Sequence, residues 1–156
     1  MRRFRDLSRR QRCATPPALA QWLVSQVREQ HACLTVACLW LMRGSAYYAI
    51  RGTDCWGVQR DARLYAGPHP IVAHPPCGPW GKLRHRCRES REDGIIAMDL
   101  VHRWGGVVEH PVGSSLFREF GHWWAPRITT INQGEWGCLC LKPTMLYWVG
   151  SERTGP

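Results

Sequence analysis

The sequence predicts a single α/β domain with a mostly parallel sheet flanked by helices. The chain has 156 residues, which suits one compact domain and not two. Its hydrophobic residues (44%) and charged residues (21%) are close to globular averages, which argues against a wholly disordered chain. The middle of the chain, from residue 70 to residue 111, contains an apolar run, an amphipathic segment and a second apolar run in succession. This order is typical of two parallel strands joined by a helix.

The first thirty residues predict an arm followed by a helix. Residues 1–15 are rich in arginine and lack a repeating apolar face, so we expect a basic arm without regular structure. Residues 16–30 are expected to begin the domain as a helix, because two prolines suit its start and apolar residues recur at helical spacing. These apolar residues are Leu19, Trp22, Leu23 and Val27.

The next segments predict a buried strand and a loop. Residues 33–42 are short, apolar and partly β-branched, which favours a strand, although the pattern alone also allows a helix. Residues 51–70 are rich in glycine, aspartate and proline, so we expect mostly loop with one short strand. The domain is expected to extend over residues 16–150, with a disordered tail at 151–156.

The centre of the chain predicts a strand, a helix and a second strand. Residues 70–74 form an apolar run ended by two prolines, which supply no donor to a strand ladder. Ser90 begins a segment that resembles a capping box and opens a helix, which a pair of glycines ends. A second strand is expected from Val107, and residues 145–149 are a plausible further strand.

Positive charge is concentrated in two short segments. The formal net charge is +9, and residues 1–12 and 82–91 account for all of it. This concentration indicates two local segments that face a polyanion, and nucleic acid is the expected partner. In the internal segment the basic residues are Lys82, Arg84, Arg86, Arg88 and Arg91.

The cysteines and the apolar runs bear on the compartment. The eight cysteines contain no CxxC pair and are too sparse for a disulfide scaffold, which favours a reducing cytoplasm. The longest apolar stretch, residues 32–42, is much shorter than the roughly 20 residues of a membrane helix. We therefore expect no membrane partner.

Unusual polar residues follow both central strands. His74 and Cys77 come after the first strand, and Glu109 and His110 end the second. Carboxyl ends of parallel strands share one edge of a sheet, so these four side chains are expected to meet in one crevice. Cys77 is a candidate nucleophile, because nearby positive charge favours the thiolate. Glu109 is a candidate proton donor or anchor for a polar base edge, or else a structural partner of an arginine or a helix end.

The same four residues are also consistent with a metal site, although their spacing matches no standard zinc pattern. A metal-dependent enzyme is therefore one alternative.

Two turns resemble the catalytic centre of the DNA cytosine-5 methyltransferases. The first is the Pro-Pro-Cys turn within residues 71–81, and the second is the Val-Val-Glu-His-Pro segment at residues 107–111. Residues 137–150 are similar to a later family segment in which an arginine-bearing turn leads into an apolar strand. Residues 54–150, with the Arg-Asp-Ala-Arg box at 60–63, resemble small proteins encoded by bacteriophages and prophages.

This resemblance implies a Rossmann-like, methyltransferase-type sheet that is incomplete at its cofactor half. S-adenosylmethionine is the implied cofactor, yet the family's glycine-rich loop has no counterpart after residues 39–42. Cys77 would add to C6 of a flipped cytosine, and Glu109 would hydrogen-bond N3 and the exocyclic amine. The basic segment 82–91 would contact DNA phosphates. The residues implied in substrate binding are His74, Trp80, His110 and Lys142.

A non-catalytic protein is the other alternative. The same scaffold could bind nucleic acid or a host protein, with Cys77 and Glu109 retained for structure. The missing glycine loop and the arginine-rich start favour this interpretation, and Trp123, Trp124 and Trp136 are then candidates for a contact surface. In either case the resemblance implies a phage or prophage protein in the cytoplasm of a bacterial host.

Overall fold

The computed structural model describes residues 14–120, 127–138 and 141–150. Most of the expected basic arm, the expected tail at 151–156 and the candidate contact residues Trp123 and Trp124 lie outside these ranges.

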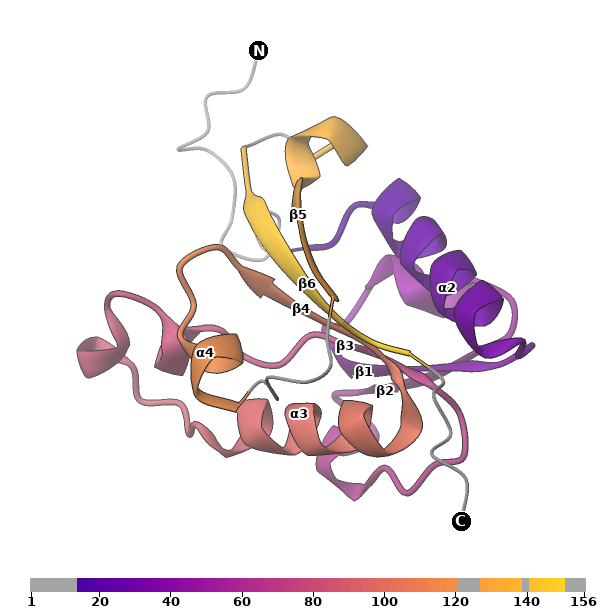
Figure 1. Ribbon diagram of the computed structural model, residues 1–156, viewed down its shortest axis with the longest axis horizontal. Helices are drawn as coiled ribbons and strands as arrows, with labels where there is room; N and C mark the ends of the chain where they lie inside the picture. The colour runs from indigo at the N-terminus through magenta and orange to yellow at the C-terminus, as the bar shows by residue number, and fades with distance from the viewer. Residues whose placement is uncertain (1–13, 121–126, 139–140, 151–156) are drawn as a thin grey trace.

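A six-stranded sheet in the order β2-β1-β3-β4-β6-β5 forms the centre of the protein (Figure 1). Strands β2, β1, β3 and β4 are parallel, and β6 is antiparallel to both β4 and β5. The predicted α/β fold with a mostly parallel, Rossmann-like sheet is therefore confirmed. The strands are β1 (Val36–Leu41), β2 (Thr53–Gly57), β3 (Ile71–Ala73), β4 (Gly106–Pro111), β5 (Arg127–Asn132) and β6 (Pro143–Val149).

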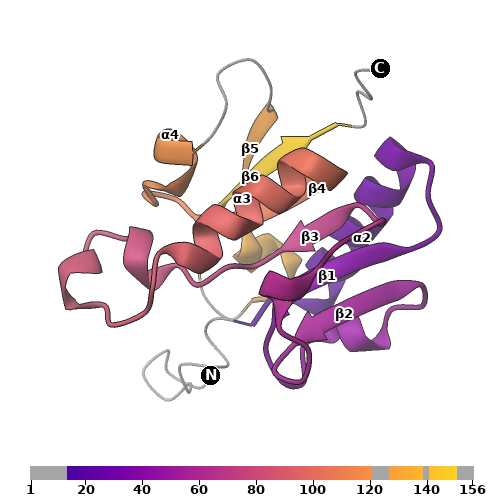
Figure 2. The same ribbon diagram turned by 90° about the horizontal axis from the view of Figure 1, so that it is seen from below.

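Helices cover both faces of the sheet. Helix α2 lies on one face, while α3 and α4 lie on the other (Figures 1 and 2). The helices are α2 (Pro17–His31), α3 (Glu92–Trp104) and α4 (Leu116–Phe120). Short 3-10 turns connect them: η2 (Ala46–Ala49), η3 (Ala62–Leu64), η4 (Gly78–Trp80), η5 (Arg84–Arg86) and η6 (Gln133–Trp136).

Alternation along the central strands divides the apolar side chains between two cores. In β3, Ile71 and Ala73 pack in the core on the α3 side, whereas Val72 packs in the core on the α2 side. In β4, Val108 and Val107 divide in the same way. Successive side chains of a strand point to opposite faces, so a strand covered on both sides is apolar at every position. This is why these strands appear in the sequence as continuous apolar runs.

Most expected elements are confirmed, with two local differences. The run at 33–42 forms β1 and not a helix, and the expected short strand between 51 and 70 is β2. Ser90 does not form the expected capping box. Its Oγ accepts a hydrogen bond from the Glu92 amide at 3.0 Å, and α3 begins there. Strand β5 was not expected, because it is an edge strand and lacks a continuous apolar run.

Gly106 is required where the chain passes from α3 into β4. Its φ is +116°, a backbone conformation that residues other than glycine rarely adopt. A Cβ at this position would overlap the backbone oxygen of Ile71 in the neighbouring strand. We expect Gly106→Ala to lower the free energy of unfolding by about 3–5 kcal/mol. Gly113 has a similar φ of +90°, but no atom lies within 4 Å of the position that a Cβ would take, so Gly113→Ala should cost only about 1 kcal/mol. Equal losses for the two variants in denaturant unfolding would contradict the steric argument.

None of the helices within the described ranges is both long and apolar enough to cross a membrane.

Candidate active site

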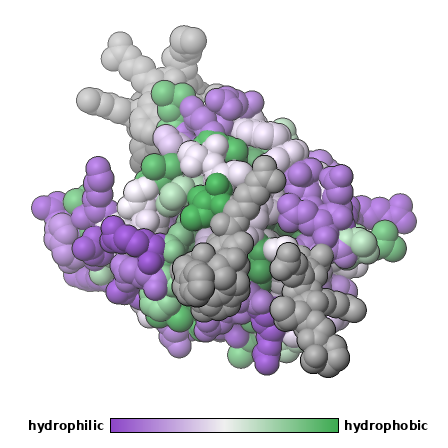
Figure 3. Space-filling model, in the orientation of Figure 1, coloured by the Kyte–Doolittle hydropathy of each residue, from purple (hydrophilic) through white to green (hydrophobic). Residues whose placement is uncertain are grey.

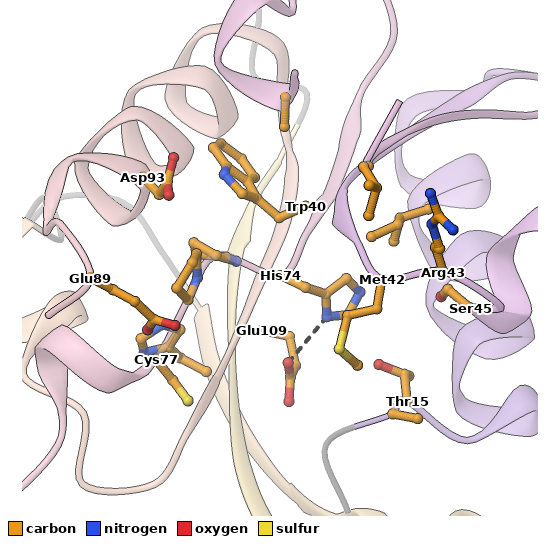
Figure 4. Close-up of a pocket in the computed structure, with 18 of the residues that line it drawn as sticks. Thr15, Trp40, Met42, Arg43, Ser45, His74, Cys77, Glu89, Asp93 and Glu109 are labelled. Atoms are coloured by element: carbon orange, nitrogen blue, oxygen red, sulfur yellow. Dashed lines mark hydrogen bonds and ion pairs between the residues drawn. The ribbon is translucent and has the colours of Figure 1, made fainter. Parts of the chain in front are cut away.

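A cavity of about 1350 Å³ lies at the carboxyl ends of the four parallel strands. The four residues that were expected to converge all line it, and Lys142 lines it as well. Figure 4 shows Glu109 near the centre of this site, with Cys77 on one side and Met42 on the other. The topology places them together because β3 and β4 are adjacent and parallel, so the residues after both strands meet at one edge.

Glu109 is the centre of a hydrogen-bonded network. It is 7% exposed, and its Oε2 lies 3.1 Å from His74 Nδ1. Its Oε1 accepts a hydrogen bond from Gln133 Nε2 at 2.7 Å and lies 3.7 Å from Lys142 Nζ. Gln133 Nε2 also donates to Thr144 Oγ1 at 3.0 Å. The carboxylate is thus held by donors from three segments of the chain.

These partners keep Glu109 ionised. Burial alone would raise its pKa, but the hydrogen bond from His74 and the charges of His74 and Lys142 outweigh it and lower the pKa to about 2. In the unliganded protein this side chain is therefore an acceptor at neutral pH. Of the two functional roles considered for Glu109, an anchor for a donor on the substrate fits better than a proton donor.

His74 lies between Glu109 and a buried tyrosine. Its Nε2 is 2.9 Å from the hydroxyl of Tyr47, which belongs to η2 and is fully buried. Burial raises the pKa of Tyr47, so this hydroxyl keeps its proton. Nδ1 carries the hydrogen that is donated to Glu109, because an ionised carboxylate can only accept. His74 therefore orients the carboxylate.

His110 is a neutral, buried side chain at the floor of the site. Its Nδ1 lies 2.6 Å from Ser114 Oγ, and burial lowers its pKa to about 4. Ser114 Oγ also accepts a hydrogen bond from the Leu116 amide at the start of α4. His110 thus connects the end of β4 to α4, and its ring contributes no charge at neutral pH.

Cys77 is exposed at the wall of the cavity. It precedes η4 and makes no side-chain cap hydrogen bond there. The basic segment returns to this turn: a Cβ at Gly78 would lie 2.7 Å from Cys87 Sγ and 2.9 Å from Glu89 Oε2. No disulfide is formed by the six cysteines that the structure describes. The Cys77 side chain is thus accessible to a ligand in the cavity.

Trp80 lies in the core and not in the cavity, so the expectation that it binds substrate requires correction. Its ring is fully buried against α3, where Gly94 leaves room for the indole. The guanidinium of Arg91 lies 3.9 Å from the ring centroid and also pairs with Glu119. Trp80 lies three positions after Cys77 on the 3-10 turn η4, and this turn directs its ring into the core. Arg91 differs from the other basic residues of its segment, because its guanidinium is bound by Trp80 and Glu119.

The other basic residues of the internal segment are exposed. Their loop coincides with a hydrophilic lobe at the left of the space-filling view (Figure 3). These residues are Lys82, Arg84, Arg86 and Arg88. Their exposure beside the Cys77 turn leaves them accessible to a polyanion.

Two site residues were not found from the sequence, Tyr47 and Gln133. Tyr47 lies in the turn after β1, which pairs directly with β3. Gln133 follows β5, which pairs with β6, which in turn pairs with β4. No local periodicity in the sequence records such a contact. The only signal near Gln133 is the polar Asn-Gln pair that ends an otherwise ordinary segment.

The other half of the cavity is formed by the residues after β1 and β2. Trp40 has a φ of +58°, at a shift in the β1–β2 register, and Gly44 has a φ of +72° with no atom within 4 Å of a Cβ position. Only β1 and β2 flank β3 on this side in the described chain. A positive φ at tryptophan is unusual, and backbone outliers of this kind cluster at functional sites. Trp40 and Gly44 both line the cavity, so this half presents an aromatic residue beside an open turn.

Metal binding has no ligand cluster within the described residues. No group of three or more His, Cys, Asp or Glu side chains there is placed to hold a metal ion. His74 and Glu109 instead bind each other. The metal-dependent alternative therefore has no support from the site.

The sequence matches no protein-family model and no curated protein. A solved structure with a similar course of the chain is that of a Listeria monocytogenes protein assigned to the class I S-adenosylmethionine-dependent methyltransferases. The TM-score is 0.47 and the sequence identity 12%, and the match covers 97% of this chain and 65% of that one.

Proposed function

We propose that this protein is a DNA-modifying enzyme of the cytosine-5 methyltransferase type, in which a thiolate adds to a pyrimidine base. One observation supports the proposal above the others. An exposed cysteine after β3 and a buried, ionised glutamate near the end of the adjacent parallel strand β4 line the same cavity. A nucleophile and a fixed acceptor are the two groups needed to attack a cytosine ring and hold its amine.

The proposed chemistry begins at Cys77. Its thiolate attacks C6 of the ring, the C5–C6 double bond opens, and electron density moves toward C5 and N3. Glu109, held by His74 and Gln133, accepts a hydrogen bond from the exocyclic amine. Lys142 carries a positive charge beside Glu109 and stabilises the negative charge that develops on the ring. A preorganised site of this kind stabilises the addition product without reorganising at the moment of reaction.

S-adenosylmethionine, bound against Trp40 and Gly44, would supply the methyl group for C5. The protein would hold this group by the shape of the cavity wall at Trp40 and by the open turn at Gly44. The target base would have to leave the DNA stack to reach Cys77. The exposed basic residues of segment 82–91 would bind the flanking phosphates.

Two measurements test the proposal. DNA from cells that express the protein is digested and its nucleosides are analysed by mass spectrometry, and 5-methylcytosine is the expected product. In parallel, the purified protein is incubated in deuterium oxide with cytosine-containing DNA and no methyl donor. Addition of Cys77 to C6 makes C5 basic, so deuterium should replace hydrogen at C5.

The second measurement separates thiolate addition from methyl transfer. Exchange without methylation would support the Cys77 chemistry and reject the cofactor assignment. Neither exchange nor a modified base, from a folded protein that binds DNA, would reject the enzyme and favour the non-catalytic DNA-binding alternative.

A further inference from the structure

We propose that Cys38 and Cys55 form an oxidisable dithiol, a modification site at which a hydroperoxide links the two residues by a disulfide. Cys38 lies in β1 and Cys55 in β2, and they are direct partners in the register of these parallel strands. Register partners point to the same face, and neighbouring strands lie about 4.8 Å apart. This spacing falls within the roughly 4.4–6.8 Å of Cα separation that a disulfide spans.

The two thiols are neighbours across paired strands and differ in access. They are close enough for each to shift the pKa of the other. Cys38 is fully buried in the core beneath α2, whereas Cys55 is partly exposed and lies 3.4 Å from Thr53 Oγ1. An oxidant can therefore reach Cys55, and Cys38 is positioned behind it as the second thiol.

The surroundings favour a thiolate at Cys55. The hydrogen bond from Cys38 is the largest influence and lowers the pKa of Cys55 to about 6, while burial raises the pKa of Cys38. The charges of Asp54 and Arg60 act on the pKa of Cys55 in opposite directions, and these two side chains form an ion pair with each other. The thiolate is the form that reacts with peroxides.

The reaction balances with hydrogen peroxide as the oxidant. The Cys55 thiolate attacks one peroxide oxygen, the O–O bond breaks, and the departing hydroxide takes a proton to become water. The Cys38 sulfur then attacks the sulfenic acid of Cys55, the S–O bond breaks, and the Cys38 proton leaves with that oxygen as a second water. Two thiols are oxidised to one disulfide, and one peroxide is reduced to two waters.

The dithiol lies outside the cavity, so the inference does not depend on the proposed function. Neither cysteine lines the cavity. A link nevertheless exists through Tyr47, which lies within electrostatic reach of both thiols and whose hydroxyl contacts His74. The disulfide would tie β1 to β2, the strands whose ends form the Trp40 half of the cavity.

Peptide mapping of the full chain tests the proposal. Reduced protein, freed of reductant, is treated with hydrogen peroxide, and the Cys77→Ala chain is treated in parallel to remove the exposed thiol. We expect a loss of two hydrogen atoms per chain, a peptide that links Cys38 to Cys55, and reversal by dithiothreitol. Absence of this peptide, or its replacement by one that joins Cys55 to another cysteine, would overturn the proposal.

Two variants sharpen the result. In Cys38→Ser the second thiol is gone, so Cys55 should stop at the sulfenic acid and be trapped by dimedone. Cys33 is another half-buried thiol. Burial raises its pKa, so it is expected to remain a thiol and to take no part in the reaction. The Cys33→Ser variant should therefore form the link between Cys38 and Cys55 at the wild-type rate. The wild-type map decides the proposal even where serine in the buried position 38 prevents folding.

Discussion

Replacing Cys77 with alanine is expected to abolish both base modification and hydrogen exchange at C5 of cytosine. The loss should be on the order of 10⁴-fold or more, because no neighbouring group can replace a covalent nucleophile. The fold should remain intact, since the Cys77 side chain is exposed and lies outside both hydrophobic cores. We expect the free energy of unfolding to change by less than about 0.5 kcal/mol. Deuterium exchange and denaturant unfolding on the same preparation measure the two effects.

Cys33→Ala is the matched control for this variant. Cys33 is also partly exposed and forms no disulfide, but it follows α2 and does not line the cavity. It should leave exchange at the wild-type rate. If Cys77→Ala retained wild-type exchange while Cys33→Ala lost it, the nucleophile would be wrongly assigned.

The convergence of Cys77 and Glu109 could be predicted from the sequence because it depends only on chain order and parallel pairing. Two apolar runs joined by a helix place their carboxyl ends at one edge, whatever the details of packing. The polar residues that end these runs must then meet. The ionised state of Glu109 could not be predicted in this way, since it depends on three partners that other segments supply.

The errors have a common physical origin in contacts that local pattern does not record. Trp80 was assigned to the substrate because of its spacing from Cys77, but the 3-10 turn directs the ring into the core, where Arg91 covers it. Tyr47 reaches the site from the turn after β1, and Gln133 reaches it through the pairing of β5 with β6 and of β6 with β4. Spacing predicts which residues lie at an edge, and the direction of each side chain depends on the turn that carries it.

Replacing Glu109 with glutamine is expected to lower the rate of C5 exchange by about 10²–10³-fold. Glutamine keeps the size of the side chain and can still accept from Gln133 through its oxygen. It lacks the charge that the donors of this site are arranged to meet, and its amide group would direct a donor at the cytosine amine. Exchange at the wild-type rate in Glu109→Gln would exclude an anchoring role for the carboxylate.

The same variant should change how stability depends on pH. The pKa of Glu109 falls from 4.5 to about 2 on folding, so its contribution is fully present above pH 4.5 and is lost as the pH falls toward 2. For a buried carboxylate this contribution is on the order of 3 kcal/mol. Glu109→Gln has no group to titrate at this position. The difference in unfolding free energy between wild type and this variant should therefore be largest at neutral pH, and it should shrink as the pH falls from 4.5 to 2.

Glu119→Gln is the control. It removes an exposed carboxylate paired with Arg91, where solvent screens the charge, and it should show a much smaller difference from wild type. A gap for Glu109→Gln that is independent of pH would mean that the side chain stabilises the protein by packing and not by its charge.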